Sequence, residues 1–456
     1  MSANVLQAQN VVISLPQANI QNRTDFQQAS TTGTYSYPLL AVVPSIHAMS
    51  TQGSFSNTIV GNTTTIPLSV IFLKLNQVGI TVLSSTTEQQ LSNNNTTLLS
   101  SLLGITLAKG AVLMNFRVAT ASQTWIAGNY KTSLRLTAED LLSASSISPQ
   151  DRDLTISVPA FMVAPGATGT TSLLVNNLSF YRSANGISNT NTIGTLVSTI
   201  PYLPNIRTNN TSQFTFVSGS LPYNTIPIIP VSTVNTSLTG IPTAQTVSLS
   251  STDKILTTTS GLPVPTNNAV SHTYTFSISA AQLKSSFAQA GTYSAPLIYS
   301  WNEVPPNTPT HVQANGALEI VVSDLSELVL NQQTVNFAFA ATDHYKNGIS
   351  QDIPGHLTLS KTTPYNLYVR ASSSNFSSGT NSIPLDIMQI GPATGETGMN
   401  TITLSTTAQK LIESANPVID RNVGIRYSIP ASQTSKLLNK PPGTYSTNVI
   451  FSFVAP

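Results

Sequence analysis

The sequence predicts an all-β protein built from three tandem immunoglobulin-like β-sandwich domains. Two observations lead to this fold class. Short segments in which apolar and polar residues alternate recur along the chain, and three short sequence features return in the same order three times. Alternation with a period of two is typical of strands that bury one face. Ordered repetition over long intervals indicates that one structural unit is present in several copies.

The alternating segments are rich in β-branched and aromatic residues, which favour strands. The 28 prolines and 24 glycines of the chain are spread between them, as many-stranded sandwiches require. Clear examples are residues 11–15, 154–158, 274–278 and 425–429. Helical patterns are short, and the best of them covers residues 137–142. The chain is therefore expected to be mostly strand.

The repeated features are a Leu-Ser turn, a short alanine-rich turn and a Gly-x-Tyr sequence that opens a strand. The Leu-Ser turns begin at Leu83, Leu249 and Leu404, and the alanine-rich turns begin at Ala121, Ala280 and Ala431. A single match can arise by chance in a chain so rich in serine and threonine. The shared order of all three features argues for three copies of one unit.

The Gly-x-Tyr sequences end at Tyr130, Tyr293 and Tyr445. In immunoglobulin-like sandwiches a tyrosine near the start of the penultimate strand turns its hydroxyl back to the backbone and locks a corner between the sheets. We interpret the three tyrosines as such corners, with the glycine allowing the tight turn before them. The simpler alternative is a turn followed by a strand, and a further copy that ends at Tyr35 lies outside the repeat. The threefold placement favours the corner.

The repeats divide the chain into units at residues 1–137, 154–301 and 316–456. Residues 138–153 are then a linker with a short helix, because Thr137 can cap a first turn whose acidic residues suit the helix dipole. Residues 302–315 contain three prolines and are expected to form a stiff second linker.

The surface is expected to be polar but almost uncharged, because charged residues make up 8% of the 456 residues, against about 25% in ordinary domains. A formal net charge of +2 provides no basic surface for nucleic acid. The absence of cysteine excludes disulfides, thiolate metal sites and cysteine nucleophiles. The sequence shows no signal peptide and no membrane-spanning segment. A secreted or cell-surface protein whose signal peptide has been removed is favoured over a cytoplasmic one.

No catalytic or cofactor motif occurs in the sequence. The five histidines lack the spacing of a metal site, and the one cluster worth naming joins His344 and His356 with neighbouring aspartates. A polar hairpin loop explains that cluster more simply. Trp125 is expected in a core and Trp301 between two domains, where ligand stacking is the alternative. We therefore expect no enzyme activity and no catalytic, cofactor or metal site.

Five short segments of the third unit carry a resemblance to a known family. They are residues 337–339 (Phe-Ala-Phe), 345–348 (Tyr-Lys-Asn-Gly), 357–359 (Leu-Thr-Leu), 364–367 (Pro-Tyr-Asn-Leu) and 443–446 (Gly-Thr-Tyr-Ser). From residue 318 onward the chain resembles bacterial pilin-type and adhesin domains of the spore-coat-U and chaperone–usher kind. The resemblance is looser over the second unit and weakest over the first. The cysteines usual in that family are absent, so the resemblance does not establish that the chain polymerises as a fibre subunit.

The resemblance implies that the last strand of the third unit is missing and is supplied by a partner. An unfilled hydrophobic groove is an aggregation hazard, so other subunits or a periplasmic chaperone are the expected partners. The segment with Val11, Ile13 and Leu15 and the segments 154–158 and 318–322 are each interpreted as the first strand of their own unit. Alternatively each completes the unit before it, which leaves the N-terminal segment as a donor strand for another molecule.

These features favour a structural or adhesive surface protein, such as a fimbria-like fibre subunit or tip, over three alternatives. A carbohydrate-binding multidomain protein, with a host or environmental surface glycan as ligand, would need exposed coplanar aromatic residues. A viral or phage fibre module would also fit the low charge. A hydrolase would need a cleft with paired acids or a Ser/His pair, and the sequence points to none. Fold-level resemblance does not name the adhesion target.

Overall fold

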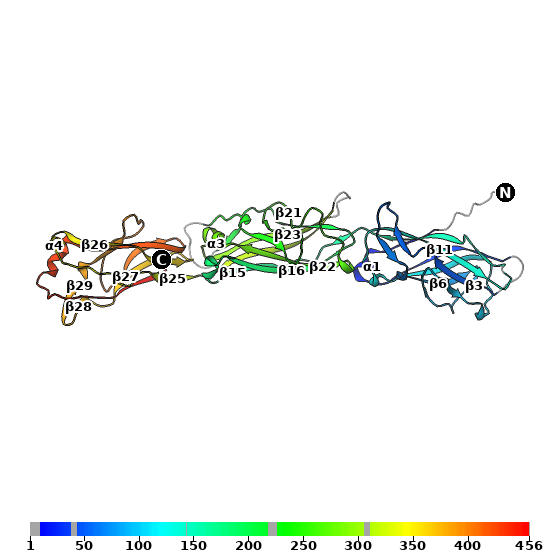
Figure 1. Cartoon of the computed structure of the whole chain (residues 1–456), viewed down its shortest axis with the longest axis horizontal. Helices are drawn as coiled ribbons and strands as arrows, with labels where there is room; N and C mark the ends of the chain where they lie inside the picture. The colour runs from blue at the N-terminus through cyan, green and yellow to red at the C-terminus, as the bar shows by residue number, and fades with distance from the viewer. Residues whose placement is uncertain (1–9, 38–42, 143, 218–225, 305–310, 456) are drawn as a thin grey trace.

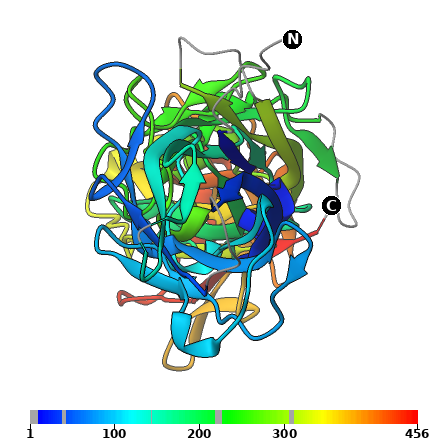
Figure 2. The same ribbon diagram turned by 90° about the vertical axis from the view of Figure 1, so that its right-hand side faces the viewer.

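The computed structural model describes residues 10–37, 43–142, 144–217, 226–304 and 311–455. The buried apolar residues form three cores that follow one another along the chain. The three domains are joined end to end in a rod, with the first domain at the right of Figure 1 and the third at the left. The view along the rod in Figure 2 shows the domains behind one another. The all-β class and the tandem sandwich architecture are confirmed.

The first domain is a sandwich of a seven-stranded and a six-stranded sheet. Its elements are β1 (Val11–Ser14), α1 (Gln17–Asn22), β2 (Phe26–Ser36), β3 (Ser45–Ser50), β4 (Ser54–Asn57), β5 (Thr65–Pro67), η1 (Leu68–Val70), β6 (Ile71–Val78), β7 (Thr81–Val82), β8 (Gln89–Gln90), β9 (Thr96–Leu99), η2 (Ser101–Leu103), β10 (Gly110–Val118), η3 (Thr120–Ser122), β11 (Gly128–Glu139), β12 (Ser146–Ser148) and β13 (Asp151–Val158). The strand orders are β1-β13-β11-β3-β9, with β4 and β5 beside them, and β12-β2-β10-β6-β7, with β8 beside them.

The second domain packs a five-stranded sheet on a six-stranded one. Its elements are β14 (Met162–Val163), β15 (Thr170–Val175), α2 (Ser179–Arg182), β16 (Ile187–Ser198), β17 (Tyr202–Thr208), β18 (Thr215–Val217), η4 (Val231–Thr233), β19 (Asn235–Leu238), β20 (Val247–Ser248), β21 (Lys254–Ile255), η5 (Thr266–Asn268), β22 (Ala269–Ile278), α3 (Ala280–Ser286), β23 (Gly291–Glu303) and β24 (His311–Val322). The strand orders are β14-β16-β22-β19-β20 and β15-β24-β23-β17-β21, with β18 paired to β23.

The third domain has a five-stranded sheet, a three-stranded sheet and a separate hairpin. Its elements are β25 (Ser326–Leu330), α4 (Thr342–Asn347), β26 (Gly348–Lys361), β27 (Tyr365–Ala371), β28 (Asn375–Ser378), β29 (Asn381–Pro384), η6 (Leu385–Ile387), β30 (Gln389–Pro392), β31 (Ile402–Thr403), β32 (Gln409–Ala415), β33 (Val418–Pro430), η7 (Ala431–Leu437) and β34 (Val449–Val454). The strand orders are β25-β26-β33-β30-β31, β32-β27-β34 and β28-β29.

Strand β10 illustrates how the sequence forms these sheets. Val112, Met114, Phe116 and Val118 are fully buried, while the residues between them are less buried. Successive side chains of a strand point to opposite faces. The alternation therefore gives β10 one apolar face that packs on the opposite sheet and one partly exposed face that carries Leu113, Asn115 and Arg117.

Two alternating segments belong to the domain before the expected one. Residues 154–158 lie in β13, which pairs antiparallel with β11 and parallel with β1 in the first domain. Residues 318–322 lie in β24, which joins β23 and β15 of the second domain in the same way. The domain boundaries therefore lie later in the chain than expected. Each segment pairs between the first strand and the tyrosine strand of the preceding domain and completes the apolar face of that sheet.

The expected helical linker at residues 138–153 is replaced by strands and a turn. β11 continues to Glu139, and the carboxylate of Asp140 then accepts backbone hydrogen bonds from Leu142 (2.8 Å), Ala144 (3.1 Å) and Ser145 (2.7 Å). An aspartate that binds the N–H groups after it stabilises a turn in competition with a helix. β12 and β13 follow within the first sandwich.

The expected proline-rich linker at residues 302–315 lies within the second domain. Asn302 of β23 pairs with His311 of β24, so the chain between them connects two neighbouring strands of one sheet. Residues 305–310, which include the three prolines, lie outside the described residues. The chain crosses into the third domain at residues 323–325, between β24 and β25.

Candidate functional site

The three repeated tyrosines each follow a short helix, which is η3, α3 or η7. Tyr130 and Tyr293 lie near the start of β11 and β23, as expected, whereas Tyr445 precedes its strand, because β34 begins only at Val449. The hydroxyls of Tyr130, Tyr293 and Tyr445 donate to the backbone carbonyl four residues earlier, at distances of 2.9, 2.8 and 2.9 Å between the oxygens. Tyr130 and Tyr293 are fully buried, whereas Tyr445 is partly exposed. The third domain therefore covers the start of its tyrosine strand less completely than the other two domains do.

The candidate donor strand is buried in its own domain. β1 pairs with β13 from Val11 opposite Leu154 to Ser14 opposite Ser157. The side chains of Val11, Ile13 and Leu15 belong to the first core and are at most 3% exposed. A strand packed in this way cannot be given to another molecule without opening its own sandwich. The segment is the first strand of its own domain. Of the donor-strand alternative, the assignment of residues 154–158 and 318–322 to the preceding domains holds, and the free N-terminal donor does not.

The sheet that contains the tyrosine strand is complete in two domains and shorter in the third. Its order is β1-β13-β11-β3 in the first domain and β15-β24-β23-β17 in the second, so β11 and β23 have partners on both edges. In the third domain the order is β32-β27-β34. Within the part of the chain that the structure describes, no strand pairs with the outer edge of β34. The places that β13 and β24 fill elsewhere are open here.

The open edge of β34 borders a groove of about 390 Å³. Residues 330–337 form one wall, residues 447–451 form the other, and side chains from inner strands form the floor. No aspartate, glutamate, lysine or arginine is among the lining residues. These are Leu330, Gln332, Gln333, Val335, Phe337, His356, Phe376, Met388, Leu404, Tyr427, Thr447, Asn448, Val449 and Phe451.

Both walls present apolar side chains at every second position. These side chains pack against the third core but stay partly exposed, and they are Val335, Phe337, Phe339, Val449, Phe451 and Phe453. The tyrosine strands of the other domains bury such positions completely, as Leu134 of β11 and Ala295 of β23 show. Exposed apolar area costs roughly 25 cal/mol per Å², and an unpaired strand edge is a template for another strand. The groove is therefore suited to bind an extended segment.

His356 lies in the floor of the groove. It is 2% exposed, its Nε2 is 2.9 Å from the hydroxyl of Tyr427, and its ring centroid is 6.1 Å from that of Phe451. Burial lowers the pKa of His356, because the charged imidazolium would lose its hydration. The residue is thus held neutral, as an apolar floor requires.

The candidate cluster of His344, His356 and neighbouring aspartates, for which the sequence favoured a simple hairpin loop, is not assembled. His344 packs its ring against Phe339, with 6.3 Å between centroids, while His356 faces the groove. Asp352 pairs with Arg426 at 2.6 Å. Across the described residues, no three His, Cys, Asp or Glu side chains are grouped so that they could hold a metal ion.

Both tryptophans are core residues. Trp125 is 1% exposed in the first core and Trp301 is 0% exposed in the second. Trp301 therefore packs inside one domain and not between two, because β23 continues through it to Glu303 and carries it into the sheet. Neither ring offers a face to a ligand.

The end of the first domain that lies away from the second domain carries a second group of exposed apolar side chains, on three loops. The first loop follows Glu139 at the end of β11, which pairs with Ser45 at the start of β3. The second loop contains η2 and lies beside the first, because the Ser101 N–H donates to Ser45 Oγ (3.1 Å). The third is the β6–β7 turn, beside Gly110 at the start of β10. We call these side chains the apolar tip; each is at least 51% exposed, and they are Ile80, Val82, Leu102, Leu103, Leu141 and Leu142.

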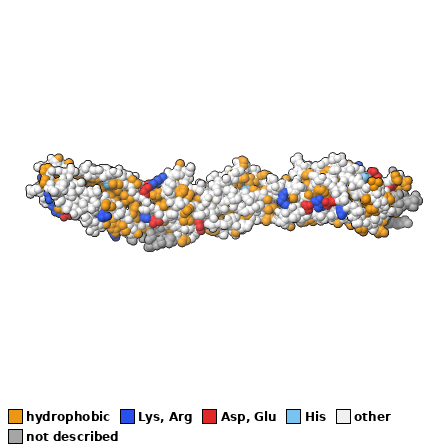
Figure 3. Space-filling model, turned by 90° about the horizontal axis from the view of Figure 1, so that it is seen from below, with side chains coloured by type: hydrophobic (Ala, Val, Ile, Leu, Met, Phe, Trp, Pro, Cys, Tyr) orange, Lys and Arg blue, Asp and Glu red, His pale blue; other side chains and the backbone are white. Residues whose placement is uncertain are grey.

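The apolar tip is not predicted by the sequence. Its only local signal is a pair of aliphatic residues inside a turn, as in the segments 79–82, 102–104 and 140–142. Strand register brings these turns to one end of the domain, and no single segment reveals that. Figure 3 shows apolar side chains gathered on the third domain and at the far end of the first, while the middle domain is mostly polar and uncharged on this face.

No family model and no curated protein matches the chain. No helix in the described ranges is long and apolar enough to cross a membrane. Among solved structures, the chain is similar to CfaE, the adhesive subunit of the CFA/I fimbria of enterotoxigenic Escherichia coli, with 8% identity and a TM-score of 0.28 over 69% of this chain and 97% of CfaE.

Two further likenesses are to tip subunits. The complex of CsuC with the tip subunit CsuE, from the archaic chaperone–usher Csu pili of Acinetobacter baumannii, matches with 15% identity and a TM-score of 0.32 over 64% of this chain and 99% of the matched chain. The CupB6 tip adhesin of Pseudomonas aeruginosa matches with 8% identity and a TM-score of 0.24 over 65% of this chain and 90% of CupB6. The chain thus has a distant structural resemblance to fimbrial tip adhesins.

Proposed function

We propose that the chain is an adhesive component of a surface fibre, secreted or exposed at the cell surface, that binds at both ends. The third domain joins another protein by accepting a β-strand in its groove. The apolar tip of the first domain makes the adhesive contact. The observation that carries the proposal is the unpaired edge of β34 beside an apolar groove, in a position that a strand fills in both other domains.

The two complete domains indicate which strand the groove accepts. β13 and β24 occupy this position, run antiparallel to the tyrosine strand, and share the pattern Leu-x-Ile-x-Val. The leucine, isoleucine and valine of both strands are buried. We expect the incoming strand to have the same alternation and direction, with main-chain hydrogen bonds to β34 and apolar side chains in the groove.

A synthetic peptide that copies β24 tests the groove on the full chain. We expect one peptide to bind per chain and to slow amide hydrogen exchange in β34, but not in β11 or β23. A peptide with serine in place of Leu318, Ile320 and Val322 is the control and should not bind. Failure of the β24 peptide to bind, or binding that leaves β34 exchange unchanged, would contradict the proposal.

Neighbouring residues of β34 provide matched variants of the chain. Phe451 lines the groove, whereas Ile450 lies on the strand between two groove-facing residues and points the other way. Phe451→Asp should abolish peptide binding, because it places a charge where an apolar side chain must pack. Ile450→Asp should leave peptide binding nearly unchanged.

The apolar tip favours an apolar target over a sugar. Removal of a leucine or isoleucine side chain from water stabilises a contact by about 1.5–3 kcal/mol when burial is complete. A polar ligand would gain little from the same side chains. Contiguous exposed apolar groups on an otherwise polar protein mark an interaction surface.

Adsorption to alkyl-coated and hydroxyl-coated surfaces, followed with a quartz crystal microbalance, tests the adhesive contact. Leu102→Ser combined with Leu141→Ser should reduce adsorption to the alkyl surface several-fold. Ile59→Ser combined with Val60→Ser is the control, since both residues are exposed but their loop lies toward the second domain, where Thr58 N–H donates to Asn129 O. Equal losses in both variants would refute a specific role of the tip.

A further inference from the structure

The joint between the first and second domains contains no ion pair among the described residues; its buried contacts are uncharged hydrogen bonds, and one exposed cation, Arg23, donates to the neutral carbonyl of Asn267 (3.2 Å). Asn268 is 1% exposed, and its side-chain amide bridges the two domains. Its Oδ1 accepts from the N–H of Trp125 (2.9 Å) and its Nδ2 donates to the carbonyl of Trp125 (2.6 Å). The Ala127 N–H also donates to Thr199 O across the joint (2.9 Å). Salt screens such neutral, buried contacts very little.

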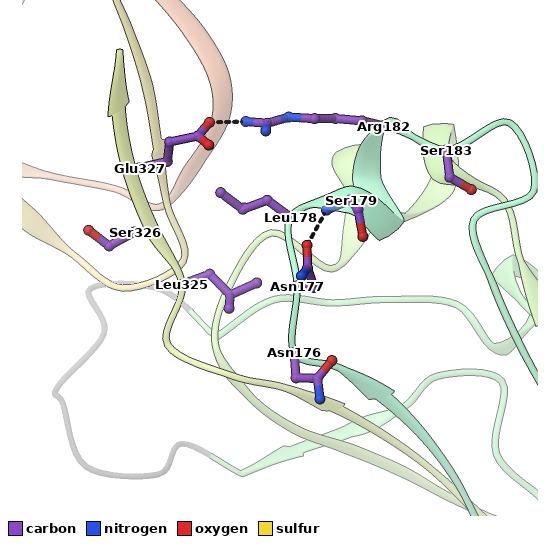
Figure 4. Close-up of a pocket in the computed structure, with 9 residues that line it drawn as sticks. All are labelled: Asn176, Asn177, Leu178, Ser179, Arg182, Ser183, Leu325, Ser326 and Glu327. Carbon is purple, nitrogen blue, oxygen red and sulfur yellow. Dashed lines mark hydrogen bonds and ion pairs between the residues drawn. The ribbon is translucent and has the colours of Figure 1, made fainter.

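The joint between the second and third domains is built differently, around ions. Asp420 of β33 is 2.8 Å from Nη2 of Arg182, at the end of α2, and 2.7 Å from Nζ of Lys284 in α3. Arg182 also pairs with the carboxylate of Glu327 in β25 (Figure 4). The two cations belong to the second domain and the two carboxylates to the third, so all three pairs cross the joint.

The position of Asp420 at the centre of this cluster is set by its surroundings. Its backbone has a φ of 54°, and its N–H donates to Ser360 Oγ (3.0 Å). Burial raises the pKa of Asp420. Hydrogen bonds from Arg182 and Lys284 lower the pKa by more than burial raises it, so the net shift is downward. Asp420 therefore stays ionised, and the cluster stays intact, through the neutral pH range.

The connection at this joint is short and anchored at each end, since Ser323 N–H donates to Val175 O of the second domain (3.0 Å) and Leu325 N–H donates to Thr362 Oγ1 of the third (2.7 Å). A hollow of about 580 Å³ lies beside the ion cluster, between residues 176–183 of the second domain and residues 325–327 (Figure 4). Three residues, 323–325, connect β24 to β25. Further contacts across the joint include a hydrogen bond from Ala290 N–H to Thr362 O (2.7 Å) and the packing of Ile419 against the second core.

We propose that the second joint is an ion-dependent hinge, while the first joint is rigid. The third domain is held in line with the rod when the ion cluster is intact, and it pivots about residues 323–325 when the cluster is screened or neutralised. The side chains of the cluster are 24–41% exposed, so dissolved salt reaches them. The rod would then bend next to the strand-accepting domain, whether or not the groove is filled.

Spin labels on the full chain test this directly, because the protein has no cysteine and labels can be placed at introduced ones. Ser188→Cys with Ser350→Cys spans the second joint, and Thr51→Cys with Ser188→Cys spans the first; all three positions are exposed. The Debye length falls from about 30 Å at 0.01 M salt to about 3 Å at 1 M. Over this range we expect the distance distribution across the second joint to broaden at least about twofold, and that across the first to stay the same.

Asp420→Asn should broaden the same distribution already at low salt. Asparagine keeps the size of the side chain and tolerates a positive φ, so the fold should persist. Asp386→Asn is the matched control, because Asp386 pairs with Lys436 (2.6 Å) inside the third domain. Equal widths at both salt concentrations in the unmodified protein would overturn the hinge, and this result would decide the question even if Asp420→Asn failed to fold.

Discussion

At the residue scale, each Gly-x-Tyr sequence places one hydroxyl against the turn that precedes its strand. Tyr130→Phe leaves a carbonyl in a buried corner without this donor, and we expect it to lower the free energy of unfolding by about 1–2 kcal/mol. Tyr445→Phe should cost less, because that corner is partly exposed. Urea denaturation measures both, with the exposed Tyr345→Phe as a control near zero. A negligible loss at Tyr130 would refute the corner role, which stays a prediction until then.

His272 makes the stability of the second domain depend on pH. It is 3% exposed beside the hydroxyl of Tyr202 (3.0 Å), and burial lowers its pKa to about 4. The unfolded chain, with a histidine pKa near 6.5, binds the proton more readily than the folded one. Stability is therefore complete above about pH 6.5 and falls as the pH drops toward 4, by up to about 3 kcal/mol.

Urea denaturation at pH 7.5, 5.5 and 4.5 checks this dependence. His272→Gln should remove most of the pH slope, since glutamine does not titrate. His311→Gln, at an exposed position, should retain the slope. A slope that survives in His272→Gln would assign the effect to another group.

Residue positions were predictable from the sequence where the geometry is local. A hydroxyl that reaches a carbonyl four residues away needs only the sequence around Tyr130 or Tyr293. The environments of Trp301 and His356 depend on where whole strands end and which strands pair. Sequence neighbours therefore predicted an interdomain position for Trp301 and a loop position for His356, whereas both side chains are buried within a domain.

At the scale of elements, β24 shows how much one strand contributes when it closes a sandwich. Ile320 is fully buried in the second core, and its neighbour Val321 points the other way and is partly exposed. Ile320→Ala should destabilise the second domain by about 2–5 kcal/mol, since it removes buried methyl groups and leaves a cavity. Val321→Ala should cost less than about 1 kcal/mol. Similar losses in both variants, measured by chemical denaturation, would show that β24 does not close the core.

Alternation identified these strands but not the domains to which they belong. The segments 154–158 and 318–322 have buried and exposed faces that are visible in the sequence, yet a period of two does not reveal the partner strand. The helix expected at residues 137–142 failed for a related reason. The strand pattern of β11 extends through Thr137, the candidate cap, and the pairing of Thr137 with His47 of β3 outweighs a weak local helix signal.

At the scale of the whole molecule, the two candidate binding surfaces lie on the first and third domains of the rod. The sequence predicted the groove of the third domain but not the apolar tip of the first. A resemblance carried by segments such as 337–339 and 443–446 predicted a missing strand in the third domain, and these segments lie at or beside the groove. The apolar tip had no such pattern, because its residues come from three turns that only strand register unites. The composition shows that few residues are charged. Only the fold shows where the uncharged polar residues lie on the surface of the rod.

The open groove predicts that the third domain is the least stable part of the rod. Its sheet around β34 has three strands where the other domains have six or seven, and its apolar walls are partly exposed. Amide hydrogen exchange on the full chain should therefore show lower protection in β27 and β34 than in β11 and β23. The β24 peptide at 100 times its Kd should add about 2.7 kcal/mol to the third domain alone. This gain should vanish in Phe451→Asp and persist in Ile450→Asp. Equal protection in all three domains without peptide would mean that the third sandwich is already closed. Addition of a strand would then not increase the stability of the third domain.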